Sequence, residues 1–184
     1  MDPRAGMLLV ASPELLDPNF ADSVVLLIDA DGDGALGVVL NRPSMVMIGD
    51  VLSPWADVAS DPGVLFSGGP VGADGALAVA QLADADDEPV GFRGSFADIG
   101  LIDLDSPVEL IEGSVAELRV FAGYAGWGAS QLEAEIAEGS WYVVPALASD
   151  LFREDTTTLR RDVLRRQPGA MAWVSTRPVD PLLN

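Results

Sequence analysis

Residues 121–133 read Phe121-Ala-Gly-Tyr-Ala-Gly-Trp-Gly-Ala-Ser-Gln-Leu-Glu, and no other part of the chain combines aromatic residues, glycines and helix-capping residues so densely. An apolar run at 118–122 predicts a strand that enters this glycine-rich stretch as a turn. Ser130 and Glu133 have the spacing of a capping box, and Gly139 is typical of a helix stop. Trp141-Tyr-Val-Val then predicts a second strand. The pattern therefore predicts a strand, a turn, a helix and a strand in succession.

Strand patterns dominate the chain before this stretch, and a second helix pattern follows it. Apolar runs predict strands at 6–11, 23–28, 35–40, 64–66, 76–80 and 99–104, with a helical turn at 48–52. An acidic, glycine-containing turn separates 23–28 from 35–40, which predicts an antiparallel hairpin. Leu159, Val163 and Leu164 give an apolar face to a helix expected from about residue 155 to 167, where Pro168-Gly169 ends it. Strands first and helices late predict an α+β fold: a single domain over 1–184 with a mixed, largely antiparallel sheet and a few helices concentrated in the C-terminal half.

The composition excludes several classes of chemistry. The chain has no cysteine, no histidine and no lysine, and all ten basic residues are arginine. A Ser-His-Asp triad, a zinc site built on His or Cys, a Schiff base and a phosphate-binding lysine are therefore impossible. Carboxylates, tyrosine, hydroxyls, arginine and backbone amides remain, together with oxygen-only Mg²⁺ or Ca²⁺ sites. The sequence names no catalytic residue, and we expect neither a cofactor nor a metal.

The net charge of −19 argues against broad binding to nucleic acid or to an anionic membrane surface. Residues 1–92 contain only two arginines, Arg4 and Arg42, so a basic patch is possible only in the second half. No signal peptide is evident and no apolar run has the length of a membrane span, so we expect a cytoplasmic protein. The acidity fits either genome composition or salt adaptation, and the oligomeric state stays open.

Three charged motifs have both a functional and a structural interpretation. Asp29, Asp31, Asp33 and Gly34 match the first half of an EF-hand loop, but the twelfth position is Leu40 and the flanks are strands, which favours an acidic hairpin turn over a calcium site. The acidic run at 84–88 favours a solvated loop over a cation site. Four arginines of the late helix favour a solvated, dipole-complementing face over a phosphate-binding patch; they are Arg160, Arg161, Arg165 and Arg166.

Two further segments could form a ligand site. Gly123, Gly126 and Gly128 could cradle an anion, but their order reverses the dinucleotide fingerprint, which favours close packing of Tyr124 and Trp127. Arg42 lies between Asn41 and Pro43 at the end of a predicted strand, where an arginine can bind a carboxylate or phosphate. A structural ion pair of Arg42 within the domain is the favoured interpretation.

These segments, taken in order, resemble the YqgE/AlgH family of bacterial proteins. The resemblance rests on Gly6-Met-Leu-Leu-Val-Ala-Ser-Pro, Asp17-Pro-Asn-Phe-Ala-Asp-Ser-Val-Val, Gly34-Ala-Leu-Gly-Val-Val-Leu-Asn-Arg-Pro, Ser67-Gly-Gly-Pro-Val and the stretch at 121–133. It implies one α+β domain with a mixed sheet and a cytoplasmic protein labelled a transcriptional regulator, with no agreed catalytic residues. Where many relatives carry histidine, this chain has Ala30 and Ala80. The motif positions that carry over are Asn41, Arg42, Pro43, Gly68, Gly69, Pro70, Gly123, Tyr124, Gly126 and Trp127.

We therefore expect a non-enzymatic regulatory protein that acts through protein partners and does not bind DNA directly. The alternative is a small-molecule-binding protein or hydrolase whose site lies where the segments 41–43 and 68–70 meet the turn Gly123–Gly128. A calcium-binding module is a third possibility. The discriminating question is whether Tyr124 and Trp127 face the core or share a pocket with Arg42.

Overall fold

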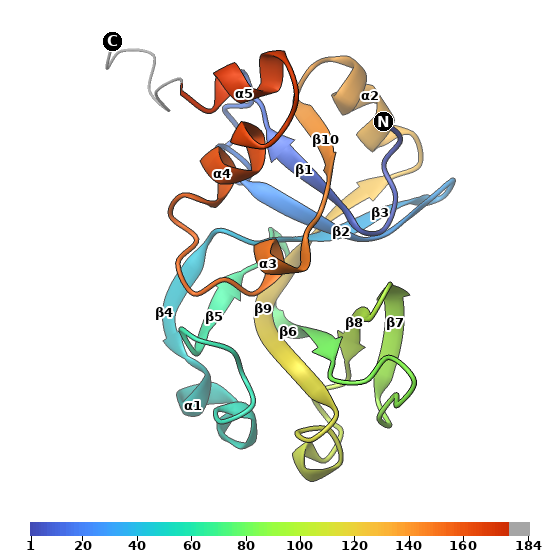
Figure 1. Ribbon diagram of the computed structural model, residues 1–184, viewed down its shortest axis with the longest axis vertical. Coiled ribbons are helices and arrows are strands. Elements are labelled where there is room, and N and C mark those ends of the chain that lie inside the picture. Colours follow the sequence, from blue (N-terminus) through green and yellow to red (C-terminus); the bar gives the residue numbers. More distant parts are fainter. Residues whose placement is uncertain (177–184) are drawn as a thin grey trace.

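A curled ten-stranded sheet forms the frame of the protein, whose computed structural model describes residues 1–176 (Figure 1). The strand order is β10-β1-β2-β3-β9-β6-β8-β7, and β5 joins β9 with β4 outside it. Every ladder is antiparallel except β5–β9. The α+β class with a mixed, largely antiparallel sheet is thereby confirmed. The strands are β1 (Met7–Ala11), β2 (Val24–Asp31), β3 (Gly34–Val39), β4 (Pro43–Met47), β5 (Val64–Ser67), β6 (Val71–Leu82), β7 (Phe92–Phe96), β8 (Ile99–Ile102), β9 (Val115–Gly128) and β10 (Trp141–Pro145).

Helices gather late in the chain, as predicted, and none of those in residues 1–176 is long and apolar enough to cross a membrane. Most helices cover one part of the sheet and leave the other part open, so we distinguish a helix-covered half and an open half (Figure 1). The helix-covered half holds β10, β1, β2 and β3, with α2, α4 and α5 packed around them. The open half holds β4 to β8 with α1, and β9 runs through both halves. The helices are α1 (Ile48–Val51), α2 (Gln131–Ala137), α3 (Ala148–Leu151), α4 (Leu159–Arg165) and α5 (Ala170–Val174), with 3₁₀ turns at Ser53–Trp55 and Val108–Leu110.

The first strand is buried on both faces, which explains its continuous apolar sequence. Side chains alternate between the faces of a strand. Leu8 and Val10 pack into the core cluster under α4, whereas Leu9 and Ala11 pack into a second cluster that includes Leu132 of α2. A third cluster lies in the open half beneath α1. A strand that is covered on both sides needs no polar face, so its sequence does not alternate between apolar and polar residues.

The glycine-rich turn predicted after residue 122 is wrong, because β9 continues without a break to Gly128. Tyr124 pairs with Val71 of β6, and Gly126 and Gly128 pair with β3. The backbone groups of this stretch therefore have ladder partners on neighbouring strands. Those partners come from distant parts of the chain, and they override the local turn preference of glycine.

Two helix boundaries also differ from the prediction. Ser130 has φ 63° and its side chain makes no cap hydrogen bond; instead the Gln131 side chain accepts from the Gly128 N–H at 3.0 Å. The stop at Gly139 is confirmed. The late helix begins at Leu159 and not near residue 155, because the Asp155 carboxylate accepts from both the backbone N–H and the hydroxyl of Thr157 and holds a turn there.

The hairpin of β2 and β3 is confirmed, with its acidic turn closed by the Asp31 carboxylate, which accepts from the Asp33 N–H at 2.8 Å. The predicted strands at 6–11, 64–66, 99–104 and 141–144 correspond to β1, β5, β8 and β10, and α1 takes up the helical turn expected at 48–52. The strand predicted at 76–80 is longer and begins at residue 71. Strands β4 and β7 were not predicted, since neither has a clear apolar alternation.

Candidate functional site

Asn41 and Arg42 hold the chain that enters β2. The Asn41 side chain accepts from the Val24 N–H at 3.0 Å and donates to the Asp22 carbonyl at 2.9 Å. Arg42 donates to two backbone carbonyls of the segment 19–21. Within residues 1–176 no carboxylate lies within ion-pair distance of Arg42, so carbonyl oxygens take the place of the expected ion pair. Both side chains therefore stabilise the loop that leads into β2.

The three segments expected to converge do meet, through their backbones. The Arg42 carbonyl accepts from the N–H of Ser67, next to Gly68, at 2.8 Å, and Gly68 donates its own N–H to the carbonyl of Ala122, next to Gly123, at 2.9 Å. A Cβ at Gly69 would overlap the backbone of Tyr124, and one at Gly123 would lie 2.5 Å from the Gly69 carbonyl oxygen. Glycine at these positions thus allows two chain segments to cross in contact. The crossing is a packed junction, and the Arg42 side chain does not line any hollow described below.

Tyr124 and Trp127 point to opposite sides of β9, so they share no pocket. Trp127 lies in the core: its ring is 6.0 Å from Phe20 and 6.1 Å from Trp141, measured between centroids. The Glu135 carboxylate accepts from the indole N–H of both tryptophans at 2.9 Å. A buried tryptophan needs such an acceptor for its N–H. Trp127 is therefore a core residue whose polar edge is satisfied by α2.

Tyr124 is half-buried and faces outward to a hollow. It packs against the core cluster under α4 and lines a space of about 280 Å³ together with Gly123. The opposite wall is the segment 72–75, four residues of β6 that stand opposite the single residue Gly123 on β9. Of the sequence-predicted positions, this hollow brings together Gly123 and Tyr124 alone.

A row of four hollows extends from this point, along the core cluster under α4 and, at the second hollow, also along the cluster beneath α1. The Tyr124 hollow shares Ala76 and Leu77 with a second hollow of about 470 Å³. That one shares Arg93 and Leu101 with a third of about 190 Å³. The third shares Leu36 with a fourth of about 270 Å³ beside the β2–β3 turn. Because adjoining hollows share lining residues, they lie in a row between the β2–β3 hairpin and strands β6, β8 and β7, and we call this row the groove.

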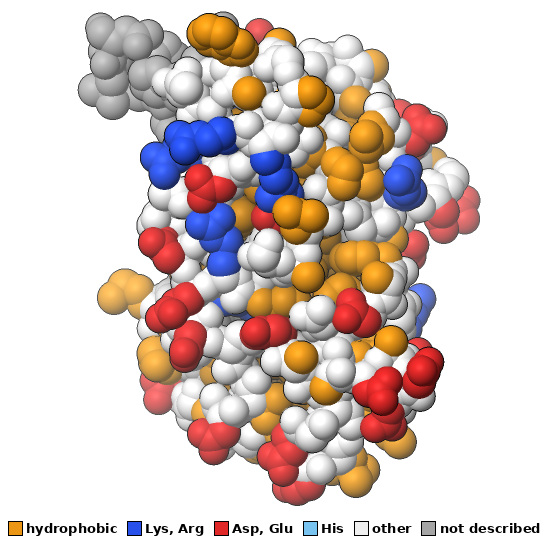
Figure 2. All heavy atoms as spheres, viewed as in Figure 1, with side chains coloured by type: hydrophobic (Ala, Val, Ile, Leu, Met, Phe, Trp, Pro, Cys, Tyr) orange, Lys and Arg blue, Asp and Glu red, His pale blue; other side chains and the backbone are white. Residues whose placement is uncertain are grey.

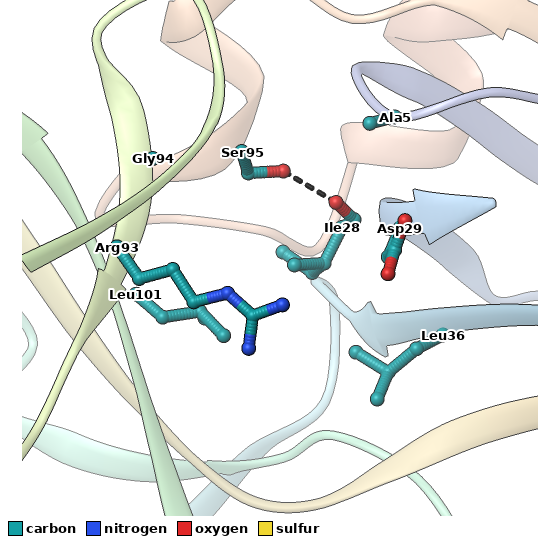
Figure 3. A pocket seen from close by; sticks show the side chains of 8 residues that line it. All are labelled: Ala5, Ile28, Asp29, Leu36, Arg93, Gly94, Ser95 and Leu101. Carbon is teal, nitrogen blue, oxygen red and sulfur yellow. Dashed lines mark hydrogen bonds between the residues drawn. The ribbon is translucent and has the colours of Figure 1, made fainter.

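Arg93 of β7 stands in the middle of this groove and is the only basic residue among its lining residues. Figure 3 shows its guanidinium extended toward Ile28 and Leu36, while its stem lies over Leu101. Within the described chain it makes no hydrogen bond and no ion pair. Ser95 also lines the hollow, but its hydroxyl already donates to the Ile28 carbonyl. Arg93 is therefore an exposed, unpaired basic group in a groove whose other charged lining residues are acidic.

Arg119 of β9 also has no carboxylate partner in the described chain, and it lies in the core at 2% exposure. Its guanidinium donates to the carbonyls of Asp61 at 2.7 Å and Leu151 at 3.2 Å, and lies 4.3 Å above the Phe66 ring. Burial lowers the pKa of Arg119 to about 10, with Glu117 opposing the shift, so the group stays charged at neutral pH. It ties α3 to the sheet and is not reachable by a ligand.

The other charged motifs have internal roles. No group of three acidic side chains within residues 1–176 is arranged to hold a metal ion. Two arginines of the late helix motif bind the protein itself: Arg160 donates to the Ala11 carbonyl at 2.7 Å, and Arg166 pairs with Asp150 at 2.6 Å, whereas Arg165 is exposed. The acidic run at 84–88 is an exposed loop. Figure 2 shows basic side chains gathered over the helix-covered half, with acidic ones spread below.

An exposed apolar surface lies on the edge strand β4 and the helix that follows it. We call it the β4 patch, and it consists of Met45, Val46, Met47 and Val51. Met45 is 97% exposed and Val51 is 53% exposed. Strand β4 pairs only with β5, and between its two ends it carries more residues than its partner, a bulge that turns Met45 outward. Apolar side chains concentrated in this way are typical of interaction sites.

The sequence interpretation missed Arg93, Arg119 and the β4 patch, although each has a signal. No acidic residue stands within four positions of Arg93, so no local ion pair accounts for it. Arg119 interrupts an apolar strand between Leu118 and Val120. Met45-Val-Met follows Pro43-Ser44 without any of the charged residues that normally shield an edge strand.

Comparisons with known proteins agree with one another. The family model described as DUF179, AlgH-like, matches residues 8–172. A UPF0301 protein of Streptomyces coelicolor is 53% identical over 182 residues, covering 97% of this chain and 94% of that protein. A UPF0301 protein of Mycobacterium tuberculosis is 42% identical over 179 residues, covering 96% and 89%.

Two solved structures extend this similarity to the fold. The crystal structure of a protein from Corynebacterium diphtheriae has a TM-score of 0.89 and 33% identity, covering 96% of this chain and 94% of that one. The solution structure of the AlgH protein from Pseudomonas aeruginosa has a TM-score of 0.66 and 25% identity, covering 97% and 98%. The resemblance drawn from the sequence motifs is confirmed, and the chain belongs to the AlgH-like family of UPF0301 proteins.

Proposed function

We propose that this protein is a non-enzymatic regulatory protein of the cytoplasm that acts by binding a protein partner through the β4 patch. The observation that carries the proposal is the exposure of Met45 and its neighbours on an edge strand. Methionine side chains are flexible and polarisable, and they are frequent on surfaces that adapt to a partner. An edge strand also offers unpaired backbone groups to an incoming segment.

The negative charge of this protein determines which kind of partner segment it attracts. The chain carries a net charge of −19, and Asp50 and Asp57 are exposed close to the patch in sequence. A second copy of this chain would bring like charge to the interface, whereas a segment with apolar and basic side chains would be attracted. The same charge opposes direct contact with DNA phosphates. The proposed occupant is therefore an apolar, basic segment of another protein.

The test is complementation in a bacterium that lacks the protein. Charged substitution of the patch in the double variant Met45→Glu/Met47→Glu should fail to restore the transcript levels that the wild type restores. The matched control is Val90→Glu, because Val90 is also strongly exposed but lies outside the patch. Both variants should unfold at the wild-type urea concentration. Full complementation by the double variant, or a sequence-specific shift of duplex DNA by the pure protein, would contradict the proposal.

The second candidate is the small-molecule-binding protein or hydrolase with a site near Arg42 and Gly123–Gly128. The Tyr124 hollow supports its binding part, because it offers a half-buried aromatic ring and about 280 Å³ of space. The Arg42 side chain is engaged with the segment 19–21, so Arg42 would act only as a support of the junction. In this form the candidate is a binding site along the groove.

A further inference from the structure

The groove has one basic residue, Arg93, and a floor that is apolar between Arg93 and Tyr124; its acidic residues stand on the walls. In the sheet register Arg93 of β7 stands opposite Leu101 of β8, which stands opposite Val79 of β6. Leu77 lies two residues from Val79 and so on the same face. Arg93 thus stands at the end of a row of apolar side chains that leads to the Tyr124 hollow.

An unpaired guanidinium beside an apolar floor is a position that favours the binding of an anion. Arginine presents a planar set of N–H donors that matches a carboxylate in a two-pronged contact. Asp29 and Asp103 line the hollows on either side of Arg93. These carboxylates leave room for a single negative charge and oppose a doubly charged group such as a phosphate monoester.

The floor also favours an aliphatic ligand over a peptide. Around Arg93, Leu101 and Val79 the strands β7, β8 and β6 pair with one another, so the backbone groups beneath this part of the floor are occupied; the outer edge of β7 and residues 72–75 of β6 have no ladder partner in the described chain. The Ser95 hydroxyl is occupied by the Ile28 carbonyl. A bound peptide would leave amide groups without partners over the floor, which is costly, whereas an aliphatic chain has none to satisfy.

We propose that the groove binds an aliphatic monocarboxylate, with the carboxylate on Arg93 and the chain along Leu101 and Leu77 toward Tyr124. The proposal is independent of the β4 patch, which belongs to β4 and α1 and shares no residue with the groove. It places the ligand between Arg93 and Tyr124, and not in the hollow beside the β2–β3 turn that Trp127 lines.

The test is calorimetric titration of the full chain with octanoate. Acetate, which has the charge without the chain, and octanol, which has the chain without the charge, should each bind at least tenfold more weakly. Arg93→Gln should weaken octanoate binding about tenfold or more, because it removes a charge-assisted contact. Arg93→Lys should recover part of it, since it keeps the charge but not the planar fork.

Two controls locate the effect. Arg161→Gln removes an exposed arginine outside the groove and should bind octanoate as the wild type does. Backbone amide signals of Gly94, Leu101 and Leu77 should shift with octanoate in NMR spectra, whereas those of the β4 patch should not. The proposal is overturned if the wild type does not bind octanoate, if Arg93→Gln binds it equally well, or if acetyl-Leu-Leu or octyl phosphate binds more tightly.

Discussion

At the scale of single residues, Arg119 is a charge placed where the fold has no carboxylate to meet it within the described chain. Backbone carbonyls of Asp61, Leu151 and Phe152 accept from its terminal nitrogens, while its Nε is buried without a partner. Burying a charge costs free energy, and dipoles offset only part of that cost. The long side chain also fills core volume, so its packing and its charge contribute with opposite signs.

Truncation and neutralisation of Arg119 should therefore differ. Arg119→Ala leaves a cavity and three carbonyls without donors, and should lower the free energy of unfolding by about 2–4 kcal/mol. Arg119→Met keeps the apolar stem and removes the buried charge, so the loss should be smaller, about 1–2 kcal/mol. Urea unfolding at pH 7 measures both, with the exposed Arg161→Met as control. Equal stability of Arg119→Ala and the wild type would refute this account of its packing.

At the scale of elements, the crossing of the β5–β6 connection over β9 determines how closely two chain segments approach. Gly69 has φ 155° and Gly123 has φ 73°, and each faces the other segment's backbone. The approach exists because neither residue carries a Cβ. Any side chain there would push β6 from β9, and β9 is the strand on which both halves depend.

Gly69→Ala should consequently destabilise the protein by about 2–4 kcal/mol, because a Cβ would overlap the Tyr124 backbone and the conformation itself disfavours alanine. The matched control is Gly113→Ala, since a Cβ at Gly113 meets nothing within 4 Å. That variant should stay within about 0.5 kcal/mol of the wild type. Thermal unfolding followed by circular dichroism compares them. A Gly69→Ala protein that melts with the control would show that the junction relaxes freely.

At the scale of the whole molecule, charge is distributed unevenly. The ion pairs of the described chain are Arg153–Asp162, Arg161–Asp162 and Arg166–Asp150, all in the helix-covered half. The open half has acidic side chains with few basic ones among them (Figure 2). Repulsion between like charges destabilises a compact state, and dissolved salt screens it.

Stability should accordingly rise with ionic strength. The urea midpoint at pH 7 should increase between 10 mM and 300 mM NaCl, and KCl at the same ionic strength should have the same effect. Amide hydrogen exchange should slow more in β6, β7 and β8 than in β1 and β2, because repulsion is less compensated there. A midpoint that falls with salt would mean that attractive ion pairs outweigh the repulsion.

The sequence predicted those parts of this molecule that depend on local pattern. The β2–β3 hairpin, α1 and the fold class follow from apolar periodicity and turn residues. The continuation of β9 through Gly123–Gly128 does not, because its partners at Gly34 and Val71 are far away in the chain. Arg93 and Met45 were not predicted for the same reason. Whether an arginine is unpaired, or an apolar side chain exposed, depends on tertiary contacts that the local sequence does not contain.

The position of β9 has a consequence for synthesis on the ribosome. The partners of β9, which are β3, β5 and β6, all precede it in the chain. Strand β1 pairs with β10, which is synthesised after β9. A nascent chain that has grown to residue 102 contains the strands of the β2–β3 and β7–β8 hairpins but lacks β9, which joins them in one sheet. The two halves close together only after residue 128 has emerged, and until then the chain exposes strand edges that molecular chaperones would have to shield.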